Sequence, residues 1–406
     1  MRILFAHNKY LVPGGEDQSA LNEARMLRDA GHDVFMWEVS NDALAGRSTL
    51  AAGLSAIWSR EACRTLAAML EAGHYDLMHV QNHFPLLSPA IHRVAAARGV
   101  ATVQHLRNYR MMCVDATLFR DGRVCRDCAA SAFAWRGVAH GCYRGSRLAS
   151  LAPAAMVAAH RLAGTWENHV DAYVAVSGHV RDLHEAAGFP ASRIHVRANL
   201  AMPANVVATG AAGAYIVAAA RLAPEKGLDV LIRAWRARPR AAKLFIAGSG
   251  SGAEEARLGA LAGGDPSIAF EGQLAPDRLI GLMAGARAVV NPALWMEPFG
   301  RTPVEAFSVG TPAIVSRIGG LADIVEDQVD GLVVAPGDVA ALDGALTTML
   351  ADHAAREVMA QGARQSYARK FAPSVLLPAT EAIYAAAIAR RRALARPAKA
   401  RAKAAL

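Results

Sequence analysis

Short runs of β-branched and aliphatic residues alternate along this chain with longer stretches rich in alanine and leucine. This alternation predicts α/β layering with parallel sheets. The first series of predicted strands comprises Arg2–Ala6, Val34–Trp37, Leu77–Val80, Ala101–Gln104, Ala172–Val176 and Ile194–Val196. The second series comprises Ala214–Ala220, Lys243–Ala247, Ile268–Glu271, Ala288–Asn291, Ala313–Val315 and Gly331–Val334. We therefore predict two Rossmann-like domains that face each other across a cleft at the ends of their strands.

The domain boundaries follow from the same pattern. Residues 1–200 are predicted to form the first domain, which includes a cysteine-containing loop at 111–143. Residues 201–213 are small, weakly patterned and contain Pro and Gly, as expected of a linker. Residues 214–373 are predicted to form the second domain. A helix over 374–389 and a basic tail over 390–406 are predicted to end the chain.

Composition and charge narrow the class of protein. The chain has 406 residues, of which 53% are hydrophobic and 19% charged, enough for two domains with separate cores. No run has the length of apolar residues that spans a bilayer, and residues 1–6 turn polar too soon for a signal peptide. We therefore expect a cytoplasmic protein.

Most of the net charge of +9 lies near the C-terminus. After Glu381 the basic residues are Arg390, Arg391, Arg392, Arg396, Lys399, Arg401 and Lys403. Such a tail is either a solvated, partly disordered terminus or a weak contact with an anionic membrane surface, at about 1 kcal/mol per basic residue. The nearly neutral remainder argues against nucleic acid as the main partner.

The segment Glu297–Gly310 carries two carboxylates eight positions apart, Glu297 and Glu305, around a Phe-Gly turn. Carboxylates are strong acceptors for the hydroxyl groups of sugars. A structural interpretation is also open, because Thr302-Pro303-Val304-Glu305 fits a capping box and Gly310 fits a helix C-terminus. Glu297 precedes the predicted helix and has no such capping role.

Three other segments carry candidate ligand-binding residues. Gly14 and Gly15 follow the first strand and precede a helix predicted to begin near Asp17, a place suited to phosphate. Arg221 and Lys226 follow the first strand of the second series and suit a diphosphate. The loop beginning at Gly248 contains three glycines but lacks the full dinucleotide-binding spacing.

The motifs R-L-A-P-E-K-G, F-E-G and E-P-F-G-x4-E-A together resemble the retaining GT-B glycosyltransferases of family 4. The resemblance implies that Arg221 and Lys226 hold the donor diphosphate. It implies that Glu297 contacts the donor sugar and that Glu305 binds the ribose hydroxyls. It also implies that backbone amides after Phe299, at Gly300 and beyond, support the phosphates, and that the Gly14-Gly15 loop closes over the donor and acceptor.

Family members generally need no metal for the transfer, so no cofactor is expected for that step. The segment from Asn82 to Pro89, followed by Gln104 to Arg110, is similar to a bacterial polysaccharide-type subgroup. That subgroup usually carries a histidine followed by Asp or Asn in the second loop. Here Arg107 occupies the histidine position and His105 lies two residues earlier, so either is a candidate acceptor-side catalytic residue.

Four cysteines lie in one loop: Cys113, Cys125, Cys128 and Cys142. Cys125 and Cys128 form a C-x-x-C knuckle, and four thiolates suit a structural zinc ion. His140 is a substitute ligand. Reduced thiols without metal, or a redox role, are the alternatives.

These observations favour a glycosyltransferase of hexosyltransferase-like type. It would transfer a sugar from a UDP- or GDP-type donor to a saccharide or lipid-linked saccharide in bacterial surface polysaccharide synthesis, at the cytoplasmic face of the inner membrane. An epimerase of nucleotide sugars or a phosphorylase of the same fold is one alternative. A zinc-containing binding protein is another.

Overall fold

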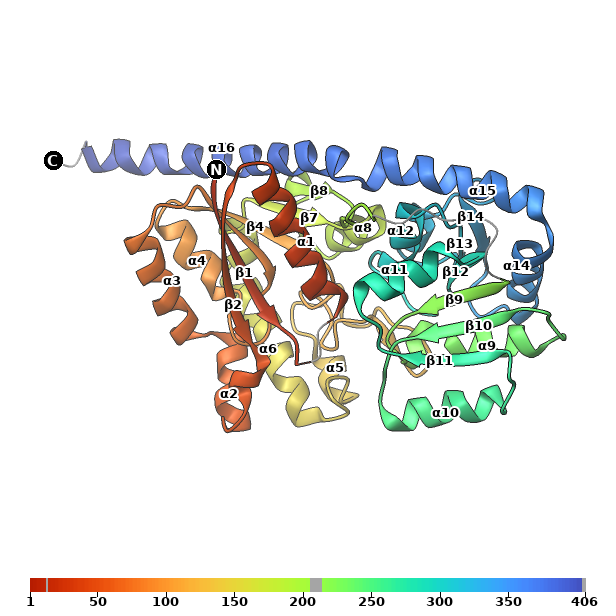
Figure 1. Ribbon diagram of the computed structural model, residues 1–406. Helices are drawn as coiled ribbons and strands as arrows, with labels where there is room; N and C mark the ends of the chain where they lie inside the picture. The colour runs from red at the N-terminus through yellow and green to blue at the C-terminus, as the bar shows by residue number, and fades with distance from the viewer. Residues whose placement is uncertain (12–13, 205–213, 404–406) are drawn as a thin grey trace. The chain divides into compact units, whose positions relative to one another are not determined.

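The computed structural model describes residues 1–11, 14–204 and 214–403, with side chains up to residue 395. The chain separates into two compact units, which are described one at a time (Figure 1). The first contains Met1–Leu118, Arg126–Ala198 and Leu376–Leu406. The second contains Phe119–Cys125 and Asn199–Val375. The predicted linker at 201–213 lies mostly outside the described residues.

The first unit is built on a parallel six-stranded sheet with the order β2-β1-β3-β4-β7-β8. Its strands are β1 (Arg2–Lys9), β2 (Asp33–Ser40), β3 (Leu77–Asn82), β4 (Ala101–Leu106), β7 (Ala172–Ala175) and β8 (Ile194–Val196). All six were predicted, with small differences at their ends. Strands β3 and β4 are buried along their whole length, so the histidine, glutamine and asparagine side chains that they carry are buried with the apolar ones.

Helices connect these strands, as parallel pairing requires. They are α1 (Gly15–Asp29), α2 (Thr49–Ile57), α3 (Arg60–Ala72), α4 (Ala90–Ala97), α5 (Trp135–Ala139), α6 (Arg147–Leu162), α7 (Thr165–Asn168) and α8 (Gly178–Ala186). Short 3-10 turns cover Asn41–Leu44 and Ala191–Arg193. A two-stranded hairpin, β5 (Phe119–Arg120) with β6 (Arg123–Val124), interrupts the cysteine-containing loop and groups with the second unit.

The second unit repeats the architecture with the order β11-β10-β9-β12-β13-β14, again in parallel. Its strands are β9 (Tyr215–Ala219), β10 (Lys243–Ala247), β11 (Ile268–Gly272), β12 (Ala288–Asn291), β13 (Ala313–Ser316) and β14 (Gly331–Val334). Its helices are α9 (Leu228–Arg236), α10 (Gly252–Ala262), α11 (Pro276–Ala284), α12 (Arg301–Ser308), α13 (Leu321–Ile324), α14 (Val339–Ala351) and α15 (His353–Ser366), with a 3-10 turn at Pro224–Lys226. The predicted fold class, two parallel-sheet α/β domains, is confirmed.

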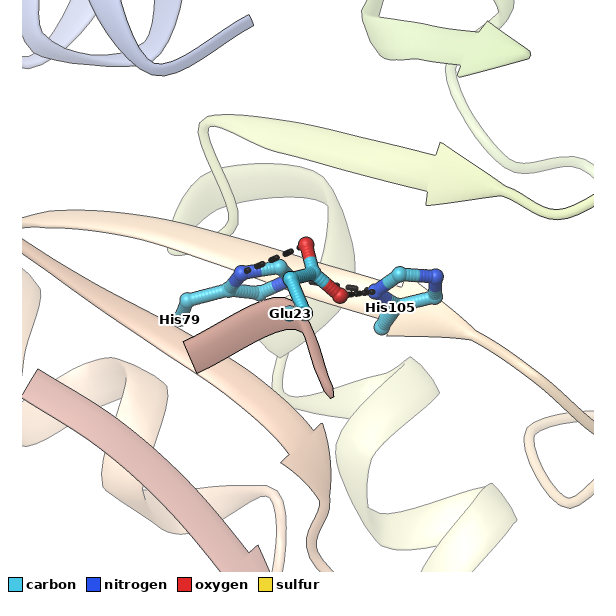
Figure 2. Close-up of side chains that lie close together, drawn as sticks. All are labelled: Glu23, His79 and His105. Carbon is cyan, nitrogen blue, oxygen red and sulfur yellow. Dashed lines mark hydrogen bonds and ion pairs between the residues drawn. The ribbon is translucent and has the colours of Figure 1, made fainter. Parts of the chain in front are cut away.

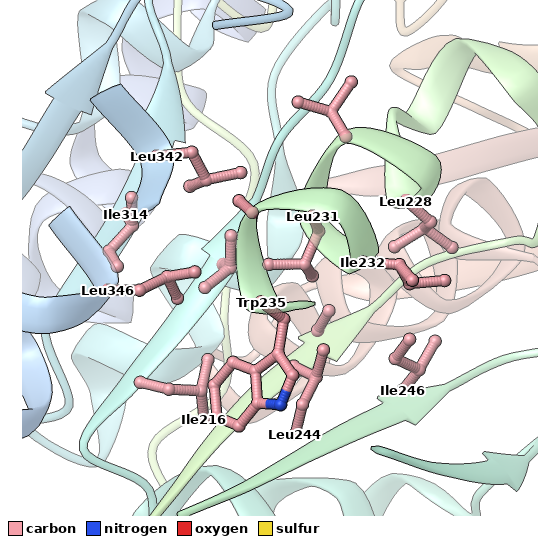
Figure 3. Packing of buried hydrophobic residues seen from close by; sticks show 14 of the residues in the cluster. Ile216, Leu228, Leu231, Ile232, Trp235, Leu244, Ile246, Ile314, Leu342 and Leu346 are labelled. Atoms are coloured by element: carbon pink, nitrogen blue, oxygen red, sulfur yellow. The ribbon is translucent and has the colours of Figure 1, made fainter. Parts of the chain in front are cut away.

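Helix α9 shows how the sequence builds the core of the second unit (Figure 3). Leu228, Leu231, Ile232 and Trp235 recur at helical spacing and are almost completely buried against the sheet and α14. Burying each such side chain contributes about 1.5–3 kcal/mol. The indole Nε1 of Trp235 donates a hydrogen bond of 2.9 Å to Ser267, so its one polar atom is satisfied.

The C-terminal helix differs from the prediction. Helix α16 runs from Pro373 to Lys403, through a π-helical turn (Tyr367–Phe371) from α15, and it continues well past residue 389. Arg391 is buried, and its guanidinium binds the carboxylate of Asp171 at 2.9 Å. The start of the basic segment is therefore part of a packed helix and not a solvated tail, because an acidic partner is present.

The helical stretch His353–Ala395 is long and apolar enough to cross a membrane by length and composition. The sequence prediction found no such run, because charged residues interrupt it at several points. Ile383, Tyr384 and Ala387 are buried within the first unit. Packing therefore buries part of this segment, 33% of its most apolar stretch.

Candidate functional site

The strand order of the second unit places the candidate site. The order reverses between β9 and β12, since the chain moves outward from β9 in one direction and from β12 in the other. Ligands of such sheets bind at the carboxyl ends of the strands at this switch point. Arg221 and Lys226 follow β9, and Glu297 and Glu305 follow β12. The four predicted donor-binding side chains therefore flank the switch point.

Lys226 and Glu297 form an ion pair at this point. Nζ of Lys226 lies 2.6 Å from Oε2 of Glu297, although the two residues are 71 positions apart. The side chains keep 16% and 12% of their exposure, so the pair is largely desolvated but still reachable from solvent. Trp295 supports both partners: its indole Nε1 donates to Glu297 at 3.0 Å, and its ring faces Nζ of Lys226 at 4.5 Å.

The backbone fixes this pair closely. Gly227 has a positive φ of 66°, and a Cβ there would lie 2.0 Å from the carbonyl oxygen of Pro292. Only glycine lets the loop after β9 approach the segment after β12 this closely. The amide of Leu294 then donates to the carbonyl of Glu225 at 2.9 Å. On the other side, the amide of Gly320 donates to the carbonyl of Glu297 at 2.7 Å.

Arg221 and Glu305 each bind a neighbour of opposite charge. Arg221 pairs with Glu225, and its own side chain is mostly exposed. Glu305 pairs with Arg301 one helical turn earlier. These short-range pairs hold the arginine and the carboxylate near the switch point.

The capping-box interpretation of Thr302 and Glu305 is wrong. Helix α12 begins at Arg301, and its N-cap is Gly300 with a φ of 99° and no side-chain cap. Thr302 and Pro303 therefore lie inside the first turn, and the carboxylate of Glu305 binds Arg301 instead of the backbone. Gly310 does follow the end of the helix with a φ of 82°, as predicted.

Three other predicted donor-binding residues have structural explanations. Gly248 has a φ of 136°, and a Cβ there would meet the carbonyl oxygen of Ala220 at 1.9 Å. Phe299 is buried and packs edge-on to Phe371 with ring centroids 6.2 Å apart. A Cβ at Gly300 would meet Leu321 at 2.4 Å. Phe299 and Gly300 can therefore contribute backbone atoms to a ligand site, whereas Gly248 is required by loop packing.

In the first unit, Gly14 is the N-cap of α1, and the helix begins at Gly15, two residues before the predicted start. Asp17 is therefore not the N-cap: its carboxylate accepts from the amide of Gly14 at 2.8 Å and binds His7 at 2.8 Å. Space is open within 4 Å of a Cβ at Gly14. The position is compatible with approach of a ligand to the first turn of α1.

A buried charged cluster in the first unit was not predicted. Glu23 of α1 binds Arg107 at 2.9 Å and also pairs with Arg197. The rings of His79 and His105 stack at a centroid distance of 5.3 Å beside the carboxylate (Figure 2). Burial favours the neutral form of Glu23, but Arg197, His79 and Arg107 outweigh it and hold the pKa of this carboxyl below its usual value.

This cluster changes the interpretation of His105 and Arg107. His105 lies within β4 and not in a loop, and its side chain is fully buried. Burial, reinforced by Arg107 and Arg197, lowers the pKa of His105 well below its usual value. Arg107 is also buried and donates to Gln81 at 2.7 Å as well as to Glu23. Both side chains are bonded inside the first unit, which suits a structural role better than contact with an acceptor.

The same cluster does not fit a metal ion. Among the described residues, one cluster contains enough potential metal ligands for a site. It consists of Glu23, His79 and His105, whose ligand atoms lie within 4.8 Å of one another. The carboxylate of Glu23 is already shared by two guanidinium groups. A divalent cation there would face two fixed positive charges at close range in a poorly solvated place. We therefore assign this cluster to stability.

Exchanging Glu23 for Gln tests that assignment. The change keeps the shape but leaves Arg107 and Arg197 buried without a counter-charge, so unfolding should be easier by about 3–5 kcal/mol. Urea unfolding of the variant measures this loss. Glu71→Gln is the matched control, because Glu71 binds Arg98 at the surface with 69% of its side chain exposed. Its expected loss is below about 1 kcal/mol, and equal losses in the two variants would contradict the assignment.

The structure does not bring the thiols proposed as zinc ligands together within the first unit. Cys113, Cys128 and Cys142 belong to this unit and Cys125 to the second, and among the described residues no cluster of three or more potential metal ligands includes a cysteine. Cys128 instead packs with Val114, Ala134 and Ala154 in a small apolar cluster. Burial raises the pKa of the Cys113 thiol, which disfavours the thiolate that zinc requires. This geometry favours a packed loop without metal and disfavours a metal-binding knuckle.

The sequence interpretation missed Glu23, Arg197, Trp295 and Tyr384. Glu23, Arg197 and Tyr384 act through partners far away in the chain: Tyr384, for example, hydrogen bonds to His79 at 2.7 Å across 305 positions. Trp295 donates to Glu297, which is close to it in the chain. The only local signal was Trp295, two residues before Glu297 in an apolar run. The other three have ordinary helical or strand-end positions in sequence.

Comparisons with known proteins cover the segment that contains the candidate site of the second unit. Residues 209–366 match the family model described as Glycosyl transferases group 1. A D-inositol 3-phosphate glycosyltransferase of Saccharomonospora viridis is 34% identical over 195 residues, covering 45% of this chain and 43% of the relative. A glycogen synthase of Mycobacterium tuberculosis is 39% identical over 118 residues, covering 29% of this chain and 28% of the relative. The chain thus aligns with less than half the length of these curated relatives.

Solved structures extend the likeness to nearly the whole fold. Anabaena HepE, whose structure was solved with UDP-glucose, gives a TM-score of 0.66 at 18% identity and covers 95% of this chain and 100% of that chain. The sucrose-phosphate synthase of Thermosynechococcus elongatus gives a TM-score of 0.68 at 20% identity and covers 94% of this chain and 98% of that chain. At these identities the likeness shows the fold.

Proposed function

We propose that this chain is a retaining glycosyltransferase of family 4 that uses a nucleotide-diphosphate sugar. The observation that carries the proposal is the Lys226–Glu297 pair at the switch point of the second sheet. It lies inside the segment that matches the Glycosyl transferases group 1 model. The pair brings together a cation suited to a phosphate and an acceptor suited to sugar hydroxyls.

The residues divide the donor between them. Lys226 and Arg221 hold the diphosphate, and the amides at the start of α12, after Gly300, add donors and the positive end of the helix dipole. Glu297 accepts from hydroxyls of the donor sugar. Glu305, in the first two turns of the same helix, accepts from the ribose hydroxyls. The family resemblance also assigns Gly14 and Gly15 to donor binding.

The observed ion pairs suggest how the site changes when donor binds. Before binding, the positive charges of Arg221, Lys226 and Arg301 are matched by Glu225, Glu297 and Glu305. An incoming diphosphate competes for Lys226 and Arg221. Glu297 is then released from Lys226 to accept from the sugar, so its hydrogen bonds to the sugar form only when a charged donor is present. Positioning and stabilisation of the leaving diphosphate are the main catalytic work, with no metal required.

The finer assignments follow the same likeness. We propose a UDP- or GDP-type donor, with UDP-glucose as the first candidate because HepE was solved with it. The acceptor is a saccharide or lipid-linked saccharide of a bacterial surface polysaccharide. The site of action is the cytoplasmic face of the inner membrane.

A donor panel followed by product analysis tests this function. A true donor should raise the melting temperature, since ligand at about 100 times its Kd stabilises the native state by about 2.7 kcal/mol. Mixtures with and without saccharide acceptors are then analysed for transferred sugar and its anomeric configuration. Interconversion of the donor alone would identify an epimerase, and transfer that requires inorganic phosphate would identify a phosphorylase. Either outcome rejects the transferase proposal.

A further inference from the structure

Two neighbouring helices of the first unit expose an unusual number of large apolar side chains. We call these residues the apolar surface. On α2 they are Leu50, Leu54 and Trp58, exposed by 74%, 58% and 41%, with Trp58 just after the helix. On α6 they are Leu148, Leu151 and Leu162, exposed by 73%, 45% and 85%. Large apolar patches of this kind mark contacts with proteins or membranes.

The six side chains lie on one side of the helix pair. A Cβ at Gly53 would lie 3.4 Å from the Cβ of Ala152, so the helices touch there. Further along, Nε2 of His160 donates to the carbonyl of Ile57 at 2.8 Å, and the ring of His160 stacks on Trp58 at 5.2 Å. The second contact lies nearer than the first to the C-terminus of both helices, so the two helices run parallel.

Helical spacing then decides the orientation. At about 100° per residue, Leu50 and Leu54 lie on the same flank of α2 relative to the contact at Gly53. Leu148, Leu151 and Leu162 also share one flank of α6. This flank is reached from the contact at Ala152 by rotating about the helix axis in the opposite sense. In two parallel helices that face each other, these two flanks form one surface. Figure 1 shows α2, α5 and α6 grouped at one end of the first unit.

The charges around this surface have one sign. Residues 43–60 and 129–166 contain no Asp or Glu. Arg144 and Arg147 are exposed at the start of α6, and the guanidinium of Arg93 lies 5.8 Å from the ring of Trp58. Arg47 is excluded from this group because it pairs with Glu61 of α3. Two further aromatic residues, Phe133 and Trp135, are exposed at the start of α5, which packs on α6.

We propose that the apolar surface inserts into the interface of a bilayer that contains anionic lipids. Leucine side chains enter the boundary between headgroups and acyl chains, while Trp58 and the neighbouring arginines remain at headgroup level. The absence of acidic residues removes repulsion from anionic phosphates, and each arginine near the surface adds attraction. The surface lies outside the candidate donor site, so this inference does not depend on the proposed activity. The inference places the membrane contact on α2 and α6, whereas the sequence had suggested the C-terminal basic segment.

Sedimentation of the full chain with phospholipid vesicles tests the inference. Vesicles of phosphatidylcholine with phosphatidylglycerol should bind the protein, and vesicles of phosphatidylcholine alone should bind at least several times less. Leu148→Glu with Leu162→Glu, and separately Leu50→Glu with Leu54→Glu, should each weaken binding by about tenfold or more. The matched control is Val358→Glu, an apolar residue of α15 in the second unit that is 62% exposed and should not affect binding. Circular dichroism and urea unfolding check that the variants fold.

Other outcomes overturn the inference. If the unaltered chain fails to bind anionic vesicles, or if both leucine variants bind as it does, the surface is not a membrane contact. If replacing Arg396, Lys399, Arg401 and Lys403 with Gln abolishes binding while the leucine variants retain it, the C-terminal segment is the contact. If light scattering shows a dimer that the leucine variants lose, while vesicle binding is absent, the apolar surface joins two copies of the chain.

Discussion

Replacing Lys226 by Ala is expected to lower the rate of sugar transfer about a hundredfold to a thousandfold. The reason is the position of its charge, which lies 2.6 Å from Glu297 at the switch point of the second sheet. The diphosphate leaving group gains negative charge as its bond to the sugar breaks. A fixed cation beside it therefore stabilises the transition state more than the ground state. The main effect should therefore be on kcat, measured with saturating donor.

Glu297→Gln should give a loss of similar size for a different reason. The amide keeps the shape of the side chain but loses the negative charge and replaces one acceptor oxygen with an NH2 donor. Because Lys226 and Glu297 bind each other, the losses should not add in the double variant. Lys243→Ala is the matched control: Lys243 is exposed at the amino end of β10, the opposite end of the sheet from the site. Near-normal rates in both single variants would contradict the assignment of this pair.

The sequence predicted that the four charged residues lie near the switch point of the second sheet, because their positions follow from local patterns. The basic pair follows a strand by a few residues, and the carboxylates follow another strand within one loop and helix. Parallel topology then brings the ends of these strands to one edge of the sheet. What the sequence could not supply was the pairing: that Glu297 binds Lys226, and that Trp295 holds both, depends on the contact made by Gly227.

The errors have equally specific causes. Thr302-Pro303 has the composition of a helix start, but the left-handed backbone at Gly300 starts α12 earlier, so the pattern matched in the wrong register. His105 was predicted to be an acceptor-side residue because it lies near a family motif in the sequence. Its surroundings are instead set by Glu23, 82 positions earlier in the chain. A buried ion pair between distant residues leaves no periodic signal, since each partner alone resembles an ordinary surface charge. This is also why the packing of Arg391 against Asp171 was missed.

Mild acid is expected to unfold the first unit while the second remains folded. All but one of the 14 histidines lie before residue 199, and several are completely buried. Burial lowers the pKa of His79 and His83 from 6.5 to about 3. It lowers the pKa of His92, His160 and His184 to about 4. These rings are therefore neutral in the native state across the range in which exposed histidines become charged.

The sign of the pH effect follows from these directions. Below 6.5 the unfolded chain binds protons that the native state does not, so stability falls as the pH falls from about 6.5 toward 4. Each fully buried histidine contributes a loss of about 2 kcal/mol between neutral pH and about pH 5. Five such losses sum to about 10 kcal/mol, which is comparable to the whole stability of an ordinary domain. Below pH 4.5 protonation of Glu23, whose pKa is lowered in the native state, adds to the loss.

Hydrogen exchange at a series of pH values distinguishes the two units. Amides of β3 and β4 should lose protection near pH 5, while those of β9 and β12 keep theirs. His184→Leu should reduce by about one the number of protons taken up on unfolding. Its Nδ1 donates within its own helix to Val180 and its ring packs on Phe189, so leucine fits the site. His353→Leu, in the second unit, should leave the first unit's pH dependence unchanged. Equal loss of protection in both sheets at one pH would show that neutral buried histidines do not control acid unfolding.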